Sequence, residues 1–102
     1  MVEYRYISKL IFLISKDGVN MNISQAISKR VILLCYEKDL TVYELSKKSG
    51  VPKTTIKDII SGRSKNPGVL SIEKLATGFS ISMGEFWNHE IFNFHQDTYR
   101  HP

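Results

Sequence analysis

The 102-residue sequence predicts an all-α domain of five helices, preceded by an N-terminal extension of undecided structure. Apolar residues recur at helical spacing between residues 23 and 38. Two Ser/Thr-x-x-Glu capping boxes open later segments, and glycines stand where three segments end. Because 42% of the residues are apolar, the composition is that of one globular domain.

Residues 1–22 form the extension, and the sequence leaves their structure open. Aromatic and β-branched residues there suit a strand, and Asp17-Gly18 marks a turn. Met21 stands just before the first firm helix, so one hypothesis takes Met21 as the natural start. The intact mass of the endogenous protein tests that hypothesis. Four apolar residues also have the spacing of one helix face: Ile7, Leu10, Ile11 and Ile14.

Residues 23–38 are predicted to form the first helix. We expect Cys35 to be buried in it as a small apolar residue rather than exposed as a reactive thiol. Asp39-Leu40 then connects this helix to the next. The apolar face comprises Ile27, Val31, Leu34 and Cys35, and the charged residues expected to lie elsewhere are Lys29, Arg30, Glu37 and Lys38.

The next two helices are bounded by residues with known helix-end preferences. A capping box opens the second helix, a proline favours the start of the third, and a glycine that tolerates positive φ ends each. The predicted bounds are residues 42–49, between Thr41 with Glu44 and Gly50, and residues 53–61, between Pro52 and Gly62.

The last two helices follow a loop rich in Ser, Asn, Pro and Gly. Residues 23–92 therefore make up the helical domain, and residues 93–102 form a polar tail that is expected to fray. The predicted bounds are a loop at 63–68, a fourth helix from a cap at Ser71 to Gly78, and a fifth from a Ser82–Glu85 capping box to about Phe92.

The two short helices within residues 41–61 satisfy the steric requirements of a helix-turn-helix. A small residue, Ser46, stands where the helices would cross, and Gly50 permits the turn between them. Such a motif projects the first residues of its second helix into the major groove of DNA. Its inward anchors are Leu45, Val51, Ile56 and Ile59.

A longer ordered series extends this pattern. It reads Leu40-Thr41-x-x-Glu44-Leu45, Gly50-Val51-Pro52-x-x-Thr55-Ile56, Ile59, Gly62, Asn66-Pro67, Leu75-Ala76 and Ile81-Ser82-x-x-Glu85-Phe86. Over residues 23–88 the chain thus resembles the helix-turn-helix domain of the phage repressor and Cro type. The resemblance implies a five-helix lambda-repressor-like fold and a DNA-binding transcriptional regulator whose recognition helix spans residues 53–61.

The resemblance also implies which residues meet DNA. It places Lys53 and Thr54 against base edges, with Lys57 beside them and Asp58 one turn later. A lysine can donate to guanine, a threonine methyl can meet a thymine methyl, and a carboxylate can accept from cytosine or exclude phosphates. The implied phosphate-binding positions are Thr41, Val42, Arg63, Lys65 and Asn66, although Asn66 is also placed to cap the turn before Pro67.

Two departures from the family pattern bear on this expectation. Many members carry glutamine where Val42 stands, and a valine side chain cannot bind phosphate, so the contact would move to the backbone or to Lys53. Many members also pair an arginine and a glutamate at the positions of Cys35 and Ile60. We expect a hydrophobic contact between these two side chains instead. Burying two uncharged side chains avoids the free-energy cost of removing charges from water.

Charge supports an anionic partner. The formal net charge is +4, and between residues 47 and 65 six basic residues face a single acidic one, Asp58. Such a stretch suits nucleic acid or an acidic membrane surface, whereas the alternative is a solvated lysine-rich face. The longest apolar run, at residues 10–14, is far shorter than the roughly 20 residues of a membrane span. We therefore expect a cytoplasmic protein.

The sequence bears on three classes of function. The first is a repressor-like regulator that binds double-stranded DNA as a homodimer on a two-fold operator. Within it, an antitoxin-type regulator with a toxin partner is an alternative. The second is a protein-interaction module on the same fold, which Val42 and Asp58 favour. The third, an enzyme, is not expected, since no nucleophile–base set, phosphate loop or paired carboxylates are visible.

No cofactor or metal is expected. The lone cysteine excludes an internal disulfide and a cysteine-based zinc site. His89, His95 and His101 recur every six residues, which is not the i, i+4 spacing of a helical metal pair.

Overall fold

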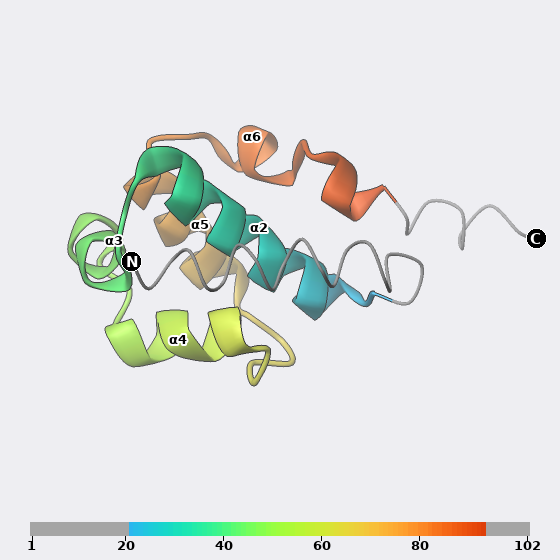
Figure 1. Cartoon of the computed structure of the whole chain (residues 1–102), viewed down its shortest axis with the longest axis horizontal. Coiled ribbons are helices and arrows are strands. Elements are labelled where there is room, and N and C mark those ends of the chain that lie inside the picture. The colour runs from blue at the N-terminus through green and yellow to red at the C-terminus, as the bar shows by residue number, and fades with distance from the viewer. Residues whose placement is uncertain (1–20, 94–102) are drawn as a thin grey trace, which may run out of the picture.

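The computed structural model describes residues 21–93, and all regular structure in that range is helical (Figure 1). The prediction of an all-α fold is therefore confirmed. The structure of residues 1–20, the start at Met21 and the fraying of residues 94–102 lie outside the described residues. The elements are α2 (Ile23–Lys38), α3 (Val42–Ser49), α4 (Lys53–Ser61), α5 (Val69–Gly78), α6 (Met83–Trp87) and a 3₁₀ turn, η2 (Glu90–Phe92).

The first three helices begin and end where the sequence predicts. The Thr41–Glu44 capping box is formed, with the Glu44 N–H donating to Thr41 Oγ1 at 3.1 Å and the Thr41 N–H donating to Glu44 Oε1 at 2.9 Å. Gly50 and Gly62 end α3 and α4 with φ of 80° and 85°. A side chain with a Cβ rarely adopts such φ values, so glycine fixes both helix ends.

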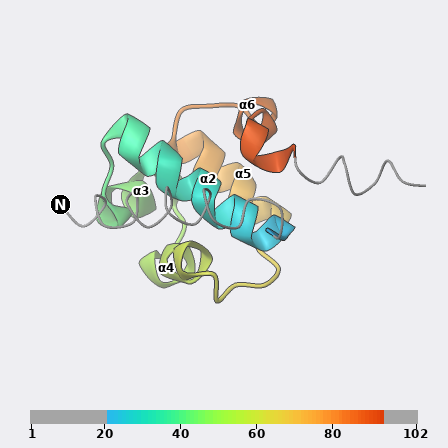
Figure 2. The same ribbon diagram turned by 45° about the vertical axis from the view of Figure 1, so that its right-hand side comes forward.

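The layers of the domain place α4 on the outside. In two views 45° apart, α2 and α5 lie between α4 on one side and α6 on the other (Figures 1 and 2). α2 packs against α4, and α3 packs against α5. The main core joins these helices through buried side chains that include Ile27, Val31, Leu34, Cys35, Leu45, Val51, Ile56, Ile59, Ile60, Ile72, Leu75, Phe79 and Phe86.

The contact between α2 and α4 sets the orientation of α4. The Ser28 hydroxyl donates to the backbone oxygen of Ile60 at 2.7 Å, within buried surroundings. Cys35 is buried, as predicted, and lies in the same core cluster as Ile60. Direct contact between the Cys35 and Ile60 side chains stays a prediction.

Two residues expected on the polar side of α2 are buried. Arg30 is 6% exposed and Lys29 is 9% exposed. The Arg30 guanidinium donates to the backbone oxygens of Phe86 at 2.7 Å and of Glu85 at 2.8 Å. These carbonyls lie at the C-terminal, partly negative end of α6, where a cation is favoured. The expected polar position of Arg30 was wrong because α6 returns to cover it.

The predicted cap of the fourth helix was wrong. α5 begins at Val69, two residues before Ser71, and its N-cap is Gly68, which has no side chain to bond the first turn. Val69 and Leu70 are exposed, so the apolar pattern that begins at Ile72 marks only where the buried part of the helix starts.

The fifth helix is shorter than predicted. The Ser82–Glu85 capping box opens α6 as expected, but the helix ends at Trp87. His89 has an extended backbone, and its Nδ1 accepts from the Ile91 N–H at 2.9 Å, which opens the separate turn η2. The local cap formed by His89 therefore competes with continuation of α6 to Phe92.

No helix within residues 21–93 is both long enough and apolar enough to cross a lipid bilayer.

Candidate nucleic-acid interface

α3, the turn and α4 form a rigid two-helix unit. The Ser46 hydroxyl donates to the backbone oxygen of Val51 at 2.7 Å, so the small residue at the crossing also binds the turn. Leu45 and Val51 are buried and anchor α3 and the turn to the core. A Cβ built at Gly78 would lie 2.8 Å from the Ser49 Cβ, so α5 contacts the end of α3 closely. The motif predicted for residues 41–61 is present.

The two faces of α4 differ sharply in polarity. Ile56, Ile59 and Ile60 are buried against the body of the domain. Lys53, Thr54 and Lys57, three of the predicted base-reading residues, are all exposed. Because α4 lies at the outside of the described domain, this exposed face is available to a partner (Figure 1).

Tyr43 is a residue of this surface that the sequence reasoning missed. This residue is 55% exposed at the start of α3. The Nζ of Lys47 lies 5.2 Å from the ring centroid, and the Nζ of Lys53 lies 5.3 Å from it. Both distances are those of a cation–π interaction. The sequence signal was an aromatic residue four positions before one lysine of the basic stretch.

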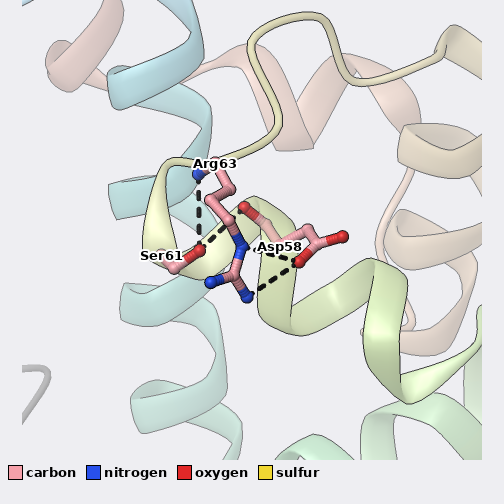
Figure 3. Close-up of polar contacts among 3 residues, drawn as sticks. All are labelled: Asp58, Ser61 and Arg63. Atoms are coloured by element: carbon pink, nitrogen blue, oxygen red, sulfur yellow. Dashed lines mark hydrogen bonds and ion pairs between the residues drawn. The ribbon is translucent and has the colours of Figure 1, made fainter.

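Asp58 and Arg63, predicted to contact a base and a phosphate separately, are bonded to each other. Arg63 Nε and Nη2 donate to Asp58 Oδ1 at 3.1 and 3.0 Å (Figure 3). Ser61 joins them, since its hydroxyl donates to the Asp58 backbone oxygen and accepts from the Arg63 N–H. The Arg63 side chain remains 74% exposed. The pair holds a guanidinium just beyond the end of α4.

The start of α3 presents backbone donors. The capping box uses the N–H groups of Thr41 and Glu44, and those of Val42 and Tyr43 have no acceptor within the helix. The Val42 side chain is partly buried against the core. Its predicted role at a phosphate is therefore restricted to the backbone, at the positive end of the α3 dipole.

The remaining predicted phosphate-binding residues lie beyond α4. Lys65 and Asn66 are exposed on the loop that joins α4 to α5. This loop leaves the C-terminal end of α4 (Figure 1), whereas Tyr43, in the first turn of α3, lies close to Lys53 at the N-terminal end of α4. Positively charged side chains or free backbone N–H groups therefore lie at both ends of the exposed helix α4. A helix in a groove of DNA has a phosphate backbone on either side, and such groups bind phosphates.

The clear pKa shifts lie away from this surface. Burial lowers the pKa of Arg30, and burial together with the Arg30 charge lowers the pKa of His89. The hydrogen bonds from Ser82 in the capping box lower the pKa of Glu85. All three residues belong to the contact between α2 and the α6–η2 segment. Among residues 21–93, no group of three or more His, Cys, Asp or Glu side chains is placed to hold a metal ion.

A comparison with protein families gives one match. The family model described as "Helix-turn-helix", which represents the phage repressor and Cro type, matches residues 32–86. The match covers α3, α4 and α5 completely, together with the C-terminal part of α2 and all of α6 except its last residue. Comparisons with curated proteins and with solved structures gave no match.

Proposed function

Because this chain belongs to the helix-turn-helix family of the phage repressor and Cro type, a family of DNA-binding regulators, we propose that it is a sequence-specific repressor that reads its operator with α4. Lys53 and Thr54 contact base edges, and Lys57 and Asp58 lie one turn along the same helix. The phosphates on either side are bound by the start of α3, at Thr41 and Val42, and by a second group after α4: Arg63, Lys65 and Asn66.

The observation that carries the proposal is the division of α4 into two faces. Its isoleucines fix the helix to the core, and the exposed lysines and threonine lie outside that core. A helix that presents Lys53 and Thr54 at its first turn offers donors and a methyl group at the end that enters a major groove. We further propose that two copies bind one operator, since a single recognition helix buries little surface.

Direct titration tests this function. The full chain is added to fluorescent duplexes from its own promoter and to a duplex of the same composition in scrambled order, and anisotropy is recorded at two salt concentrations. A repressor binds the promoter fragment more tightly than the scrambled one. Its log affinity falls by about 0.9 per log unit of salt for each phosphate neutralised.

Two observations favour a second candidate, a protein-interaction module. The side chain of Val42 packs against the core, and Asp58 places a carboxylate on the helix that should meet DNA. In that case the promoter and scrambled duplexes bind equally weakly, and the salt dependence is shallow. The basic face of α3 and α4 would then meet an acidic protein surface, such as that of a toxin.

A further inference from the structure

We propose that Tyr43 is a positioning residue that holds Lys53 in a set place for base reading, with Lys47 as the second cation on the same ring. This inference rests on the proposed function, because it deepens the role of Lys53 at the start of α4. It adds to the predicted DNA-contacting residues Tyr43, which the sequence pattern does not single out, and Lys47, which the sequence pattern counts only within the basic stretch.

The geometry joins the starts of two helices through one side chain. Tyr43 stands in the first turn of α3, and Lys53 is the first residue of α4. The Lys53 Nζ is 5.3 Å from the ring centroid. A lysine side chain has four flexible methylenes, and an exposed lysine samples many rotamers. The attraction to the negative ring face reduces this freedom at the residue expected to enter the groove first.

Lys47 places a second cation on the Tyr43 ring. It lies four residues after Tyr43 on the same face of α3, and its Nζ is 5.2 Å from the same ring. Two ammonium groups from different helices thus share one aromatic side chain. They repel each other, and a phosphate group near both cations relieves this repulsion. We expect Lys47 to contact the DNA backbone while Lys53 reaches a base.

The exposure of Tyr43 argues against a purely structural role. More than half of the side chain is open to solvent, and the core of α3 is anchored by Leu45, which is fully buried. The motif is also held by the Ser46–Val51 hydrogen bond and the capping box, neither of which uses the Tyr43 side chain. Replacement of Tyr43 should therefore leave the fold intact.

The first test needs no DNA. Ring currents shift the NMR signals of methylene groups near an aromatic face, so the Lys53 side-chain resonances are recorded in the free full-length protein. We expect shifted signals in the wild type and in Tyr43→Phe, which keeps the ring, and ordinary lysine signals in Tyr43→Leu. Ordinary signals for Lys53 in the wild-type chain would overturn the inference.

The second test is a double-mutant cycle on DNA. Discrimination is measured at the base pair whose preference is lost in Lys53→Ala. Tyr43→Leu should lower that discrimination roughly two- to fivefold, as expected for an exposed cation–π contact. When Lys53→Ala is already present, Tyr43→Leu should have no further effect on discrimination at that base pair. Tyr43→Phe should restore wild-type discrimination, and Tyr36→Leu, at an exposed tyrosine on α2, should behave as wild type.

The outcomes separate the two proposals. If the wild-type chain fails to distinguish promoter from scrambled duplex, the proposed function is wrong, and the positioning role falls with it even where the NMR shifts are seen. If the wild type discriminates but Tyr43→Leu and Lys53→Ala have additive effects, only the positioning role of Tyr43 is wrong.

Discussion

At the scale of single residues, the exposed face of α4 combines cations with one carboxylate, and the position of that carboxylate decides how Arg63 is used. The Arg63 guanidinium is held by Asp58 at 3.0 and 3.1 Å and is still largely exposed. Asp58 can thus orient Arg63 toward a phosphate, or it can read a base itself. The two roles lead to different results for the same substitution.

Asp58→Asn distinguishes these roles. If Asp58 orients Arg63 and repels phosphates, the change should strengthen binding to promoter and scrambled duplexes alike, because a negative charge is removed and Arg63 is released. The salt dependence should steepen by about 0.9 log unit for each phosphate gained. Because both side chains are exposed, the free energy of unfolding should change by less than about 1 kcal/mol. Anisotropy and urea unfolding give these quantities.

The opposite outcome for Asp58→Asn would be an altered preference at a single base pair without a general gain in affinity. That result would make Asp58 a base-reading residue, as the family resemblance implies. Arg63→Ala serves as the matched variant, since it should weaken binding to both duplexes and flatten the salt dependence.

At the scale of elements, the ends of helices were the most predictable features. The two Ser/Thr-x-x-Glu boxes and the glycines at 50 and 62 act through residues three or four positions apart, so a local pattern suffices to find them. The start of α5 was missed because its cap, Gly68, contributes no side chain. The end of α6 was missed because His89 forms a local cap that helical periodicity does not reveal.

The contact between α3 and α5 gives a prediction about packing. A Cβ at Gly78 would lie 2.8 Å from the Ser49 Cβ and 3.1 Å from the Ser49 backbone, so Gly78→Ala forces the two helices apart. We expect a loss of about 1–3 kcal/mol in the free energy of unfolding, measured by urea denaturation. DNA binding should weaken as well, because α3 carries one side of the interface.

Gly84→Ala is the matched control for Gly78→Ala. Gly84 is also helical, but an added Cβ would make only an ordinary contact, 3.7 Å from Ser82 Oγ. Alanine is the better helix former, so this change should leave stability unchanged or raise it by up to about 1 kcal/mol. Equal stability losses in both variants would show that helix α5 does not approach Ser49 as closely as described.

At the scale of the whole molecule, α6 is held to α2 by two hydrogen bonds of Arg30 that the sequence did not reveal. Arg30 follows Lys29 in the sequence, and its burial depends on the return of α6 across α2. For the same reason, the interface could be predicted only in part from the sequence. The exposed α4 face follows from local periodicity, whereas the Tyr43–Lys53 and Asp58–Arg63 pairs depend on how segments meet in space.

Removal of Arg30 should release this segment. Arg30→Met removes the buried guanidinium donor of the Phe86 backbone oxygen and leaves the Glu85 oxygen with the Asn88 N–H alone, at 3.3 Å. We expect a loss of about 2 kcal/mol or more in the free energy of unfolding. Arg30→Lys, which keeps one charged donor, should lose less. Equal stability of Arg30→Met and the wild type in urea would contradict a role for these bonds.

The same contact predicts how stability depends on pH. Burial and the Arg30 charge lower the pKa of His89, and His89 Nδ1 accepts a hydrogen bond that protonation removes. The unfolded chain, with a histidine pKa of about 6.5, therefore binds more protons than the folded chain below that pH. The contribution of His89 to the free energy of unfolding is fully present above about pH 6.5. It is lost as the pH falls toward the pKa of His89 in the folded chain, and below that pKa it no longer changes.

His89→Asn tests the pH dependence because asparagine can accept the same hydrogen bond without titrating. The difference in unfolding free energy between wild type and His89→Asn should shift in favour of the variant on going from pH 7.5 to pH 5. A constant difference across that range would mean that His89 has the same pKa in the folded and unfolded chains.

The central claim is that the first turn of α4 reads bases, and selection of duplexes from a random library tests it most directly. Wild-type protein, Lys53→Ala, Thr54→Ala and Lys65→Ala are each used to select bound sequences, and base preferences are compared position by position. We predict that Lys53→Ala and Thr54→Ala each lose the preference at one or two adjacent base pairs and keep the rest, whereas Lys65→Ala keeps every preference with lower affinity. Unchanged preferences in the Lys53 and Thr54 variants would contradict base reading by α4.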